Sequence, residues 1–101
     1  NSAKASQFSA SAVSIQRSAS LLVENQIINQ LERASSSIAL NLAEGYGRIG
    51  KADQKRFYVI AMGSLRESQA ILDLALKNDN LLIQKLDILA AHLAKLIKCY
   101  P

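Results

Sequence analysis

A helical repeat between residues 27 and 48 constrains the fold of this chain more than any other feature. Apolar side chains recur there at steps of three or four residues, which is the spacing of one face of an α-helix. They are Ile27, Leu31, Ala34, Ile38 and Leu42. Gly45 and Gly47 follow, and glycine is favoured at the end of a helix and disfavoured inside one. The sequence therefore predicts a helix over 21–46 that ends in a glycine-rich chain reversal.

Three further segments show helical spacing. The first has a regular seam over residues 5–22, formed by Ala5, Phe8, Ala12, Ile15, Ala19 and Leu22, and predicts a helix over 3–18. Ser20 is the expected N-cap of the helix that follows. The other two segments predict helices over 51–77 and 81–99, separated by the turn-forming residues 78–80. Gly63 lies inside the third of the four helices, where we expect it to allow a neighbouring helix to approach closely.

The composition supports an all-α fold. Of the 101 residues, 50% are hydrophobic but only 5% are aromatic, so alanine, leucine and isoleucine form the core, and these residues favour helices. Four helices with short connections predict an antiparallel up-down-up-down four-helix bundle, with residues 1–101 as a single domain. No apolar run approaches the roughly 18 residues needed to span a bilayer, and no signal pattern opens the chain. With Cys99 as the single cysteine, a cytoplasmic protein without membrane association is expected.

The net charge is +4, and the positive charges are expected to lie mainly at one end of the fold. In the predicted bundle, the N-terminus, the turn after residue 46 and the C-terminus share one end. That end would collect Lys4, Arg48, Lys51, Lys55, Arg56, Lys95 and Lys98, against Glu44 and Asp53. Such a basic pole attracts phosphates over a Debye length of roughly 8–10 Å, which predicts a nucleic-acid-binding surface. The alternative interpretation is that exposed helix ends carry charge for solubility.

No catalytic or metal-binding constellation is present in the sequence. The single histidine, His92, and Cys99 would supply two ligands at most, which is too few for a zinc site. The glycines after residue 44 lack the spacing of a phosphate-binding loop and no strand precedes them. We therefore expect a protein that is not an enzyme and that needs no cofactor.

A polar seam accompanies the apolar face of the second helix. The charged and amide side chains of this seam are Arg33, Asn41, Glu44 and Arg48. On the third helix, Arg56 and Glu67 are expected to lie opposite them. Glu44 and Arg48 have the i,i+4 spacing and acid-first order that favour an ion pair. Two interpretations are open: a hydrogen-bond network that sets the register of two helices, which we favour, or a surface read by a ligand.

Two sequence blocks carry a resemblance to a known family. The first block contains Gln30, Arg33, Ala34, Ser37, Ile38, Asn41, Ala43, Glu44, Gly45, Gly47 and Arg48, and the second contains Arg56, Phe57, Ala61, Gly63, Ser64, Leu65 and Glu67. Together they resemble the proteins encoded in intervening sequences of 23S ribosomal RNA genes, also called S23 ribosomal proteins. The resemblance covers about residues 27–76, and outside that range only the helical periodicity agrees.

The resemblance implies a small four-helix bundle that assembles into a ring, commonly a pentamer. The wide apolar arc of the helix over 81–99 is also compatible with a homo-oligomer, because surplus apolar surface often marks a protein interface. The leading functional hypothesis is a non-enzymatic bundle that associates with RNA or other nucleic acid, including DNA, through the basic pole. The alternative is a protein-interaction scaffold or an accessory subunit, for example of a reverse transcriptase, which does not itself bind nucleic acid.

Overall fold

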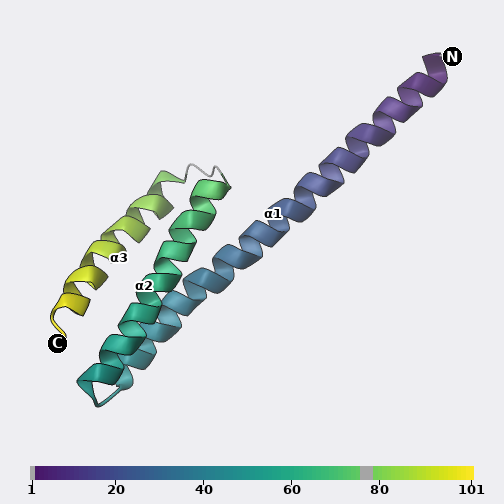
Figure 1. Ribbon diagram of the computed structural model, residues 1–101. Coiled ribbons are helices and arrows are strands. Elements are labelled where there is room, and N and C mark those ends of the chain that lie inside the picture. The colour runs from purple at the N-terminus through teal and green to yellow at the C-terminus, as the bar shows by residue number, and fades with distance from the viewer. Residues whose placement is uncertain (1, 76–78) are drawn as a thin grey trace.

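The computed structural model describes residues 2–75 and 79–101, and every regular element in them is an α-helix. The helices are α1 (Ser2–Gly47), α2 (Lys51–Leu74) and α3 (Asn80–Lys98), as Figure 1 shows. The prediction of an all-α chain is confirmed. The prediction of four helices in an up-down-up-down bundle is wrong, because the described residues form three helices in an extended arrangement.

The error lies in the first 46 residues, where the helices predicted over 3–18 and 21–46 are one continuous helix. No glycine or proline occurs between residues 2 and 44, so nothing in the sequence ends the helix near the predicted N-cap, Ser20. The serines in this stretch lower helix propensity by only a fraction of a kcal/mol each, roughly up to 0.7, which weakens a helix without breaking it. Helix α1 contains 46 residues and extends well beyond its neighbours (Figure 1).

The other two helices agree closely with their predicted ranges. Helix α2 begins at the predicted residue, Lys51, and ends at Leu74, while the end predicted at residue 77 lies outside the described residues. The Asp79 side chain caps α3 by accepting a hydrogen bond from the Leu82 N–H at 3.0 Å. Helix α3 therefore begins one residue before the predicted start and ends one residue before the predicted end.

The core lies along α2, which packs against α1 on one side and α3 on the other. One cluster of buried side chains contains Ile38, Leu65, Leu72, Leu86 and Ala90, and a second, nearer the α1–α2 turn, contains Tyr58, Ala61 and Leu93. Within the described residues, the backbones of α1 and α3 do not approach each other closely. Helix α2 is thus the central helix of the packed part of the chain.

Residues 3–26 of α1 lie outside this core, and all of them are exposed. The radius of gyration is 20.6 Å, whereas a compact domain of this length has a value of about 13 Å. The long dimension of 74 Å reflects the projecting half of α1, which Figure 1 shows extending alone from the packed helices. No described helix combines the length and hydropathy needed to cross a membrane.

The close approach predicted at Gly63 is also wrong, because a Cβ atom at that position would have no neighbour within 4 Å. The helices approach closely at Gly45 instead, where a Cβ would lie 2.7 Å from Cε1 of Tyr58. Gly45 is buried in the contact between α1 and α2. Gly45, which was predicted only to end a helix, is therefore the glycine that permits close helix packing.

Candidate nucleic-acid interface

The candidate interface is the end of the molecule where α1 turns into α2. Residues 48–50 form the turn, and the main-chain N–H of Arg48 donates a hydrogen bond to the Gly45 carbonyl at 3.2 Å. Gln54 then joins three segments: its Nε2 donates to the Arg48 carbonyl at 2.7 Å, and its Oε1 accepts from the Tyr100 hydroxyl at 2.8 Å. These bonds place the segment after α3 beside the turn.

A second contact brings the same segments together. Lys55 on α2 donates from Nζ to the carbonyl of Pro101 at 3.1 Å. The last turn of α3, which carries Lys95 and Lys98, therefore lies at the same end as the α1–α2 turn. Two segments that are far apart in the sequence, residues 48–56 and the last turn of α3, therefore contribute cations to one end of the fold.

Two arginines at this end pack on one aromatic ring. The guanidinium carbons of Arg48 and Arg56 lie 4.7 and 4.5 Å from the centre of the Phe57 ring. Arg48 also pairs with Glu44 at 2.6 Å and approaches Asp53 at 4.0 Å, while Arg56 lies 3.6 Å from Asp53. These ion pairs are half-exposed, so each stabilises the fold by about 1 kcal/mol or less. Their main effects are to orient both arginines and to neutralise part of their charge.

The structure brings together six of the seven cations predicted for the basic pole. They are Arg48, Lys51, Lys55, Arg56, Lys95 and Lys98, which we call the basic end, and the carboxylates beside them are those of Glu44 and Asp53. In the part of the chain that the structure describes, Lys51, Lys95 and Lys98 form no ion pair. The placement of Lys4 is wrong, because α1 does not fold back and carries Lys4 to the opposite end of the molecule (Figure 1).

Two large side chains at the turn are open to solvent. Tyr46 is 85% exposed and Ile49 is 100% exposed. Tyr46 therefore offers an accessible ring face of the kind on which nucleic-acid bases stack. Tyr100 is different, since it is half-buried and meets Tyr58 edge to face with ring centres 5.6 Å apart.

The predicted polar seam is only partly present as a connected network. Asn41 donates to the Ser37 carbonyl at 2.8 Å, and the Ser37 and Ser64 hydroxyls are 2.7 Å apart, which links α1 to α2. The Glu44–Arg48 pair also forms, whereas Arg56 pairs with Asp53. Arg33 and Glu67, by contrast, are both exposed and join neither group. The bridge between the helices is therefore made by serines and one amide, not by the charged members of the seam.

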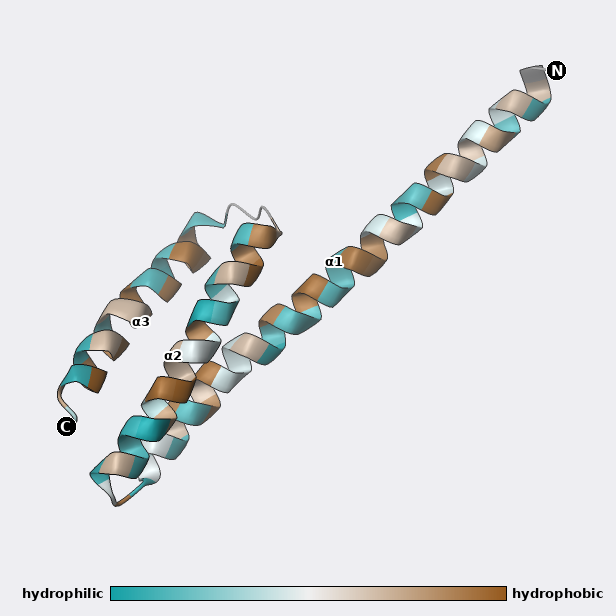
Figure 2. Ribbon diagram, viewed as in Figure 1, coloured by the Kyte–Doolittle hydropathy of each residue, from teal (hydrophilic) through white to brown (hydrophobic). Residues whose placement is uncertain are grey.

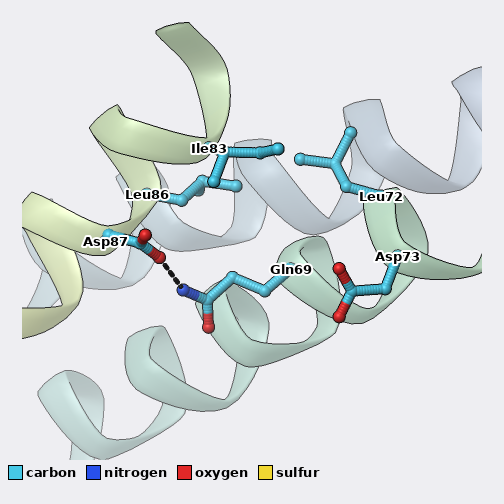
Figure 3. A pocket seen from close by; sticks show the side chains of 6 residues that line it. All are labelled: Gln69, Leu72, Asp73, Ile83, Leu86 and Asp87. Carbon is cyan, nitrogen blue, oxygen red and sulfur yellow. Dashed lines mark hydrogen bonds between the residues drawn. The ribbon is translucent and has the colours of Figure 1, made fainter. Parts of the chain in front are cut away.

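A hollow lies between α2 and α3. Figure 3 shows its lining, with Gln69 Nε2 donating to Asp87 Oδ1 at 2.9 Å and the Asp73 carboxylate nearby. The remaining lining residues are Leu72, Ile83 and Leu86. Within the described residues, no group of three side chains suited to a metal ion occurs, here or around His92 and Cys99. The lining of the hollow thus combines three apolar side chains with two carboxylates and one amide.

Comparison with protein families gives a match that covers nearly the whole chain. The profile of the 23S rRNA-intervening sequence proteins matches residues 2–100. The chain belongs to this family. Comparisons with the curated proteins and with the solved structures found no match. Membership of the 23S rRNA-intervening sequence proteins therefore extends the resemblance, first seen over residues 27–76, to all three helices.

Two residues important to the architecture of this family member were not among the predicted site residues. Gln54 connects the turn to Tyr100, and Phe57 supports both arginines. Phe57 was recognisable in the sequence as part of the second block, but its contact with Arg48 depends on how the turn closes. Gln54 had no periodic or motif signal, because its role depends on the position of a segment 46 residues away.

Burial raises the pKa of the Tyr58 phenol above its ordinary value of 10.0, and the neighbouring Tyr100 raises it further. A raised pKa means that the folded state favours the neutral phenol. Tyr58 should therefore stabilise the fold fully below pH 10 and lose that contribution as the pH rises through its folded pKa. We expect the free energy of unfolding, measured by urea denaturation between pH 8 and 11, to fall less steeply at high pH for Tyr58→Phe than for the unmodified protein. Identical pH profiles for the two proteins would contradict this assignment.

Proposed function

We propose that this 23S rRNA-intervening sequence protein is a non-enzymatic, cytoplasmic homo-oligomer that associates with RNA, or with another nucleic acid, through the basic end. The observation that carries the proposal is the convergence of six cations and two carboxylates from residues 44–56 and the last turn of α3. Charges gathered within a Debye length reinforce one another's field, and phosphate contacts supply most of non-specific nucleic-acid affinity. The exposed ring of Tyr46 adds one stacking surface.

The contacts at the basic end separate two kinds of cation. Arg48 and Arg56 are packed on Phe57 and share the Asp53 carboxylate, so they support the surface as well as charging it. Lys51, Lys95 and Lys98 are exposed and have no carboxylate partner among the described residues, which leaves their ammonium groups available for phosphates. With one exposed aromatic ring at this end, the proposal is for recognition of the backbone without readout of base sequence.

The extended shape of the chain supports assembly. A projecting half-helix with exposed apolar side chains is a surface that association would cover. The family resemblance implies a ring, commonly a pentamer. The second candidate function, a protein scaffold or accessory subunit, is favoured by the same apolar surface, because a different protein could also cover it.

Fluorescence anisotropy with a labelled ribosomal RNA fragment, titrated at several salt concentrations, tests the proposal. Lys51, Lys95 and Lys98 are replaced together by Glu, and the matched control replaces Lys4, Arg17 and Lys85 by Glu, which changes the net charge equally away from the basic end. We expect binding that weakens with salt, with a log–log slope of roughly 0.7 for each neutralised phosphate. The first variant should lose binding and the control should retain it.

Two results would overturn the proposal. One is no binding even at low salt, which would favour the protein scaffold. The other is an equal loss of affinity in both triple variants, which would show that net charge alone is responsible.

A further inference from the structure

Tyr46 places an aromatic ring at the basic end that the packing of the helices does not use. It lies in the last turn of α1 and is 85% exposed. Within the part of the chain that the structure describes, no hydrogen bond and no aromatic or cation–π contact involves its side chain. Phe57, Tyr58 and Tyr100 differ, because each of their rings packs against another side chain. The Tyr46 ring is therefore available to a ligand.

The residues next to Tyr46 leave room for a ligand to approach. At Gly47, a Cβ atom would meet no described atom within 4 Å beyond its chain neighbours and the backbone of its own helix, and φ lies outside the left-handed region. Neither packing nor backbone conformation therefore requires glycine there, whereas glycine does allow a ligand to approach the main chain closely. Ile49, in the turn that follows, is 100% exposed. We call Tyr46 and Ile49 the tip.

Positive charge lies close to the tip. Arg48 is two residues from Tyr46, and Lys51 is two residues from Ile49. Two residues span at most about 7 Å, which is less than one Debye length at physiological salt. Figure 2 shows mainly hydrophilic residues over the first turns of α2, where this segment continues.

These charges favour an anionic ligand over an apolar protein surface. Lys51 forms no ion pair with any described residue. An apolar surface that covered the tip would bury this ammonium group without a counter-charge, which is costly, whereas a polyanion supplies the counter-charge. A nucleic acid combines such charges with flat rings, because its phosphates pair with cations and its bases stack on aromatic side chains.

The exposed ring distinguishes unpaired nucleotides from a duplex. Bases in a duplex already stack on one another, so a ring on a protein surface reaches a base face at a loop, a bulge or an end. We propose that the basic end recognises unpaired nucleotides, with one base stacked on Tyr46 and the adjoining phosphates at Arg48 and Lys51. This selectivity rests on the proposed function, nucleic-acid binding at the basic end, and adds the form of nucleic acid that is bound.

The tip recognises the unpaired state of a base and not its identity. Every base has a face on which an aromatic ring can stack, so stacking tolerates any sequence. Ile49 adds an apolar contact to the neighbouring base, as exposed apolar side chains do when they insert between base steps. Because each chain carries its own tip, this recognition does not depend on the number of subunits in an assembly.

Anisotropy titrations with two labelled RNAs test the role of Tyr46. One RNA is a single-stranded oligouridine of about 12 nucleotides, a length within the range of single-strand binding sites, and the other is a blunt duplex of the same length. Tyr46→Ala should weaken oligouridine binding by roughly 5- to 100-fold, the loss of one stacked base, and should change duplex binding by less than about 2-fold. Leu74→Ala is the matched control, because it removes a side chain that is 84% exposed at the far end of α2, and it should change neither affinity.

A single tryptophan reports the stacking directly. The chain contains no tryptophan, so Tyr46→Trp introduces one indole at the tip. A base stacked on the indole quenches its fluorescence, and we expect quenching by the oligouridine but not by the duplex. Leu74→Trp, at the other end of a helix about 35 Å long, should respond to neither RNA. Circular dichroism and light scattering check that all variants fold and assemble as the unmodified chain does.

Two results would overturn the proposal, and they differ in what they leave standing. If neither RNA binds the unmodified chain, the proposed function fails as well. If both RNAs bind but Tyr46→Ala weakens both equally or neither, or the oligouridine does not quench Tyr46→Trp, the basic end still binds nucleic acid. The tip then does not stack on bases, and its exposed side chains are left for a protein partner.

Discussion

Replacing Leu65 by Ala is expected to lower the free energy of unfolding by about 3–4 kcal/mol, a large part of the roughly 5–15 kcal/mol that stabilises an ordinary domain. Leu65 is 0% exposed and belongs to the cluster that joins Ile38 of α1 to Leu86 of α3. Truncation removes the apolar contacts and leaves a cavity that three helices would have to close together. Because α1 and α3 contact each other little, α2 cannot move toward one without leaving the other.

Leu74→Ala provides the matched control on the same helix. Leu74 is 84% exposed, so the identical change in chemistry should alter the free energy of unfolding by no more than about 0.5 kcal/mol. Urea denaturation followed by circular dichroism measures both variants, at one protein concentration so that assembly contributes equally. Similar losses for the two variants would show that Leu65 is not the centre of the core.

Much of the fold follows from local sequence signals. The start of α2 and the bounds of α3 were predicted to within one residue, because glycines and Asp79 end and begin those helices. The break near residue 20 was predicted on weaker grounds, since serines reduce helicity without preventing it. The apolar seam of residues 5–22 and that of residues 27–42 lie on different sides of α1. Such a change of side is compatible with a break in the helix, and equally with one straight helix whose two halves pack against different partners.

The candidate site was predictable where it depends on position along the chain. The cations of the turn and of the last turn of α3 were correctly grouped, since short connections bring those segments to one end. Lys4 was misplaced because its location depends on the path of the whole of α1. The roles of Gln54 and Phe57 depend on side-chain contacts across segments, which no periodic pattern encodes.

At Gly45, local helix propensity and contacts between helices have opposite effects. Gly45→Ala is expected to destabilise the protein by about 1–3 kcal/mol. Within a helix, alanine is better than glycine by about 1 kcal/mol, so propensity alone predicts the opposite sign. The added Cβ would lie 2.7 Å from Tyr58 Cε1 and 3.2 Å from the main-chain oxygen of Gln54. Tyr58 is buried against Tyr100 and Gln54 is held by the turn, so neither moves without separating α1 from α2.

Gly63→Ala isolates the steric part of this effect. Beyond its chain neighbours and the adjacent backbone of its own helix, no described atom lies within 4 Å of the position of its Cβ, so this variant should gain about 0.5–1 kcal/mol from propensity and from a less flexible unfolded chain. Urea denaturation of the two variants should therefore give changes of opposite sign. A stabilised Gly45→Ala protein would mean that α1 and α2 are farther apart at the turn than the structure shows. The position of Arg48 on Phe57, and with it the geometry of the basic end, would then differ from the arrangement described.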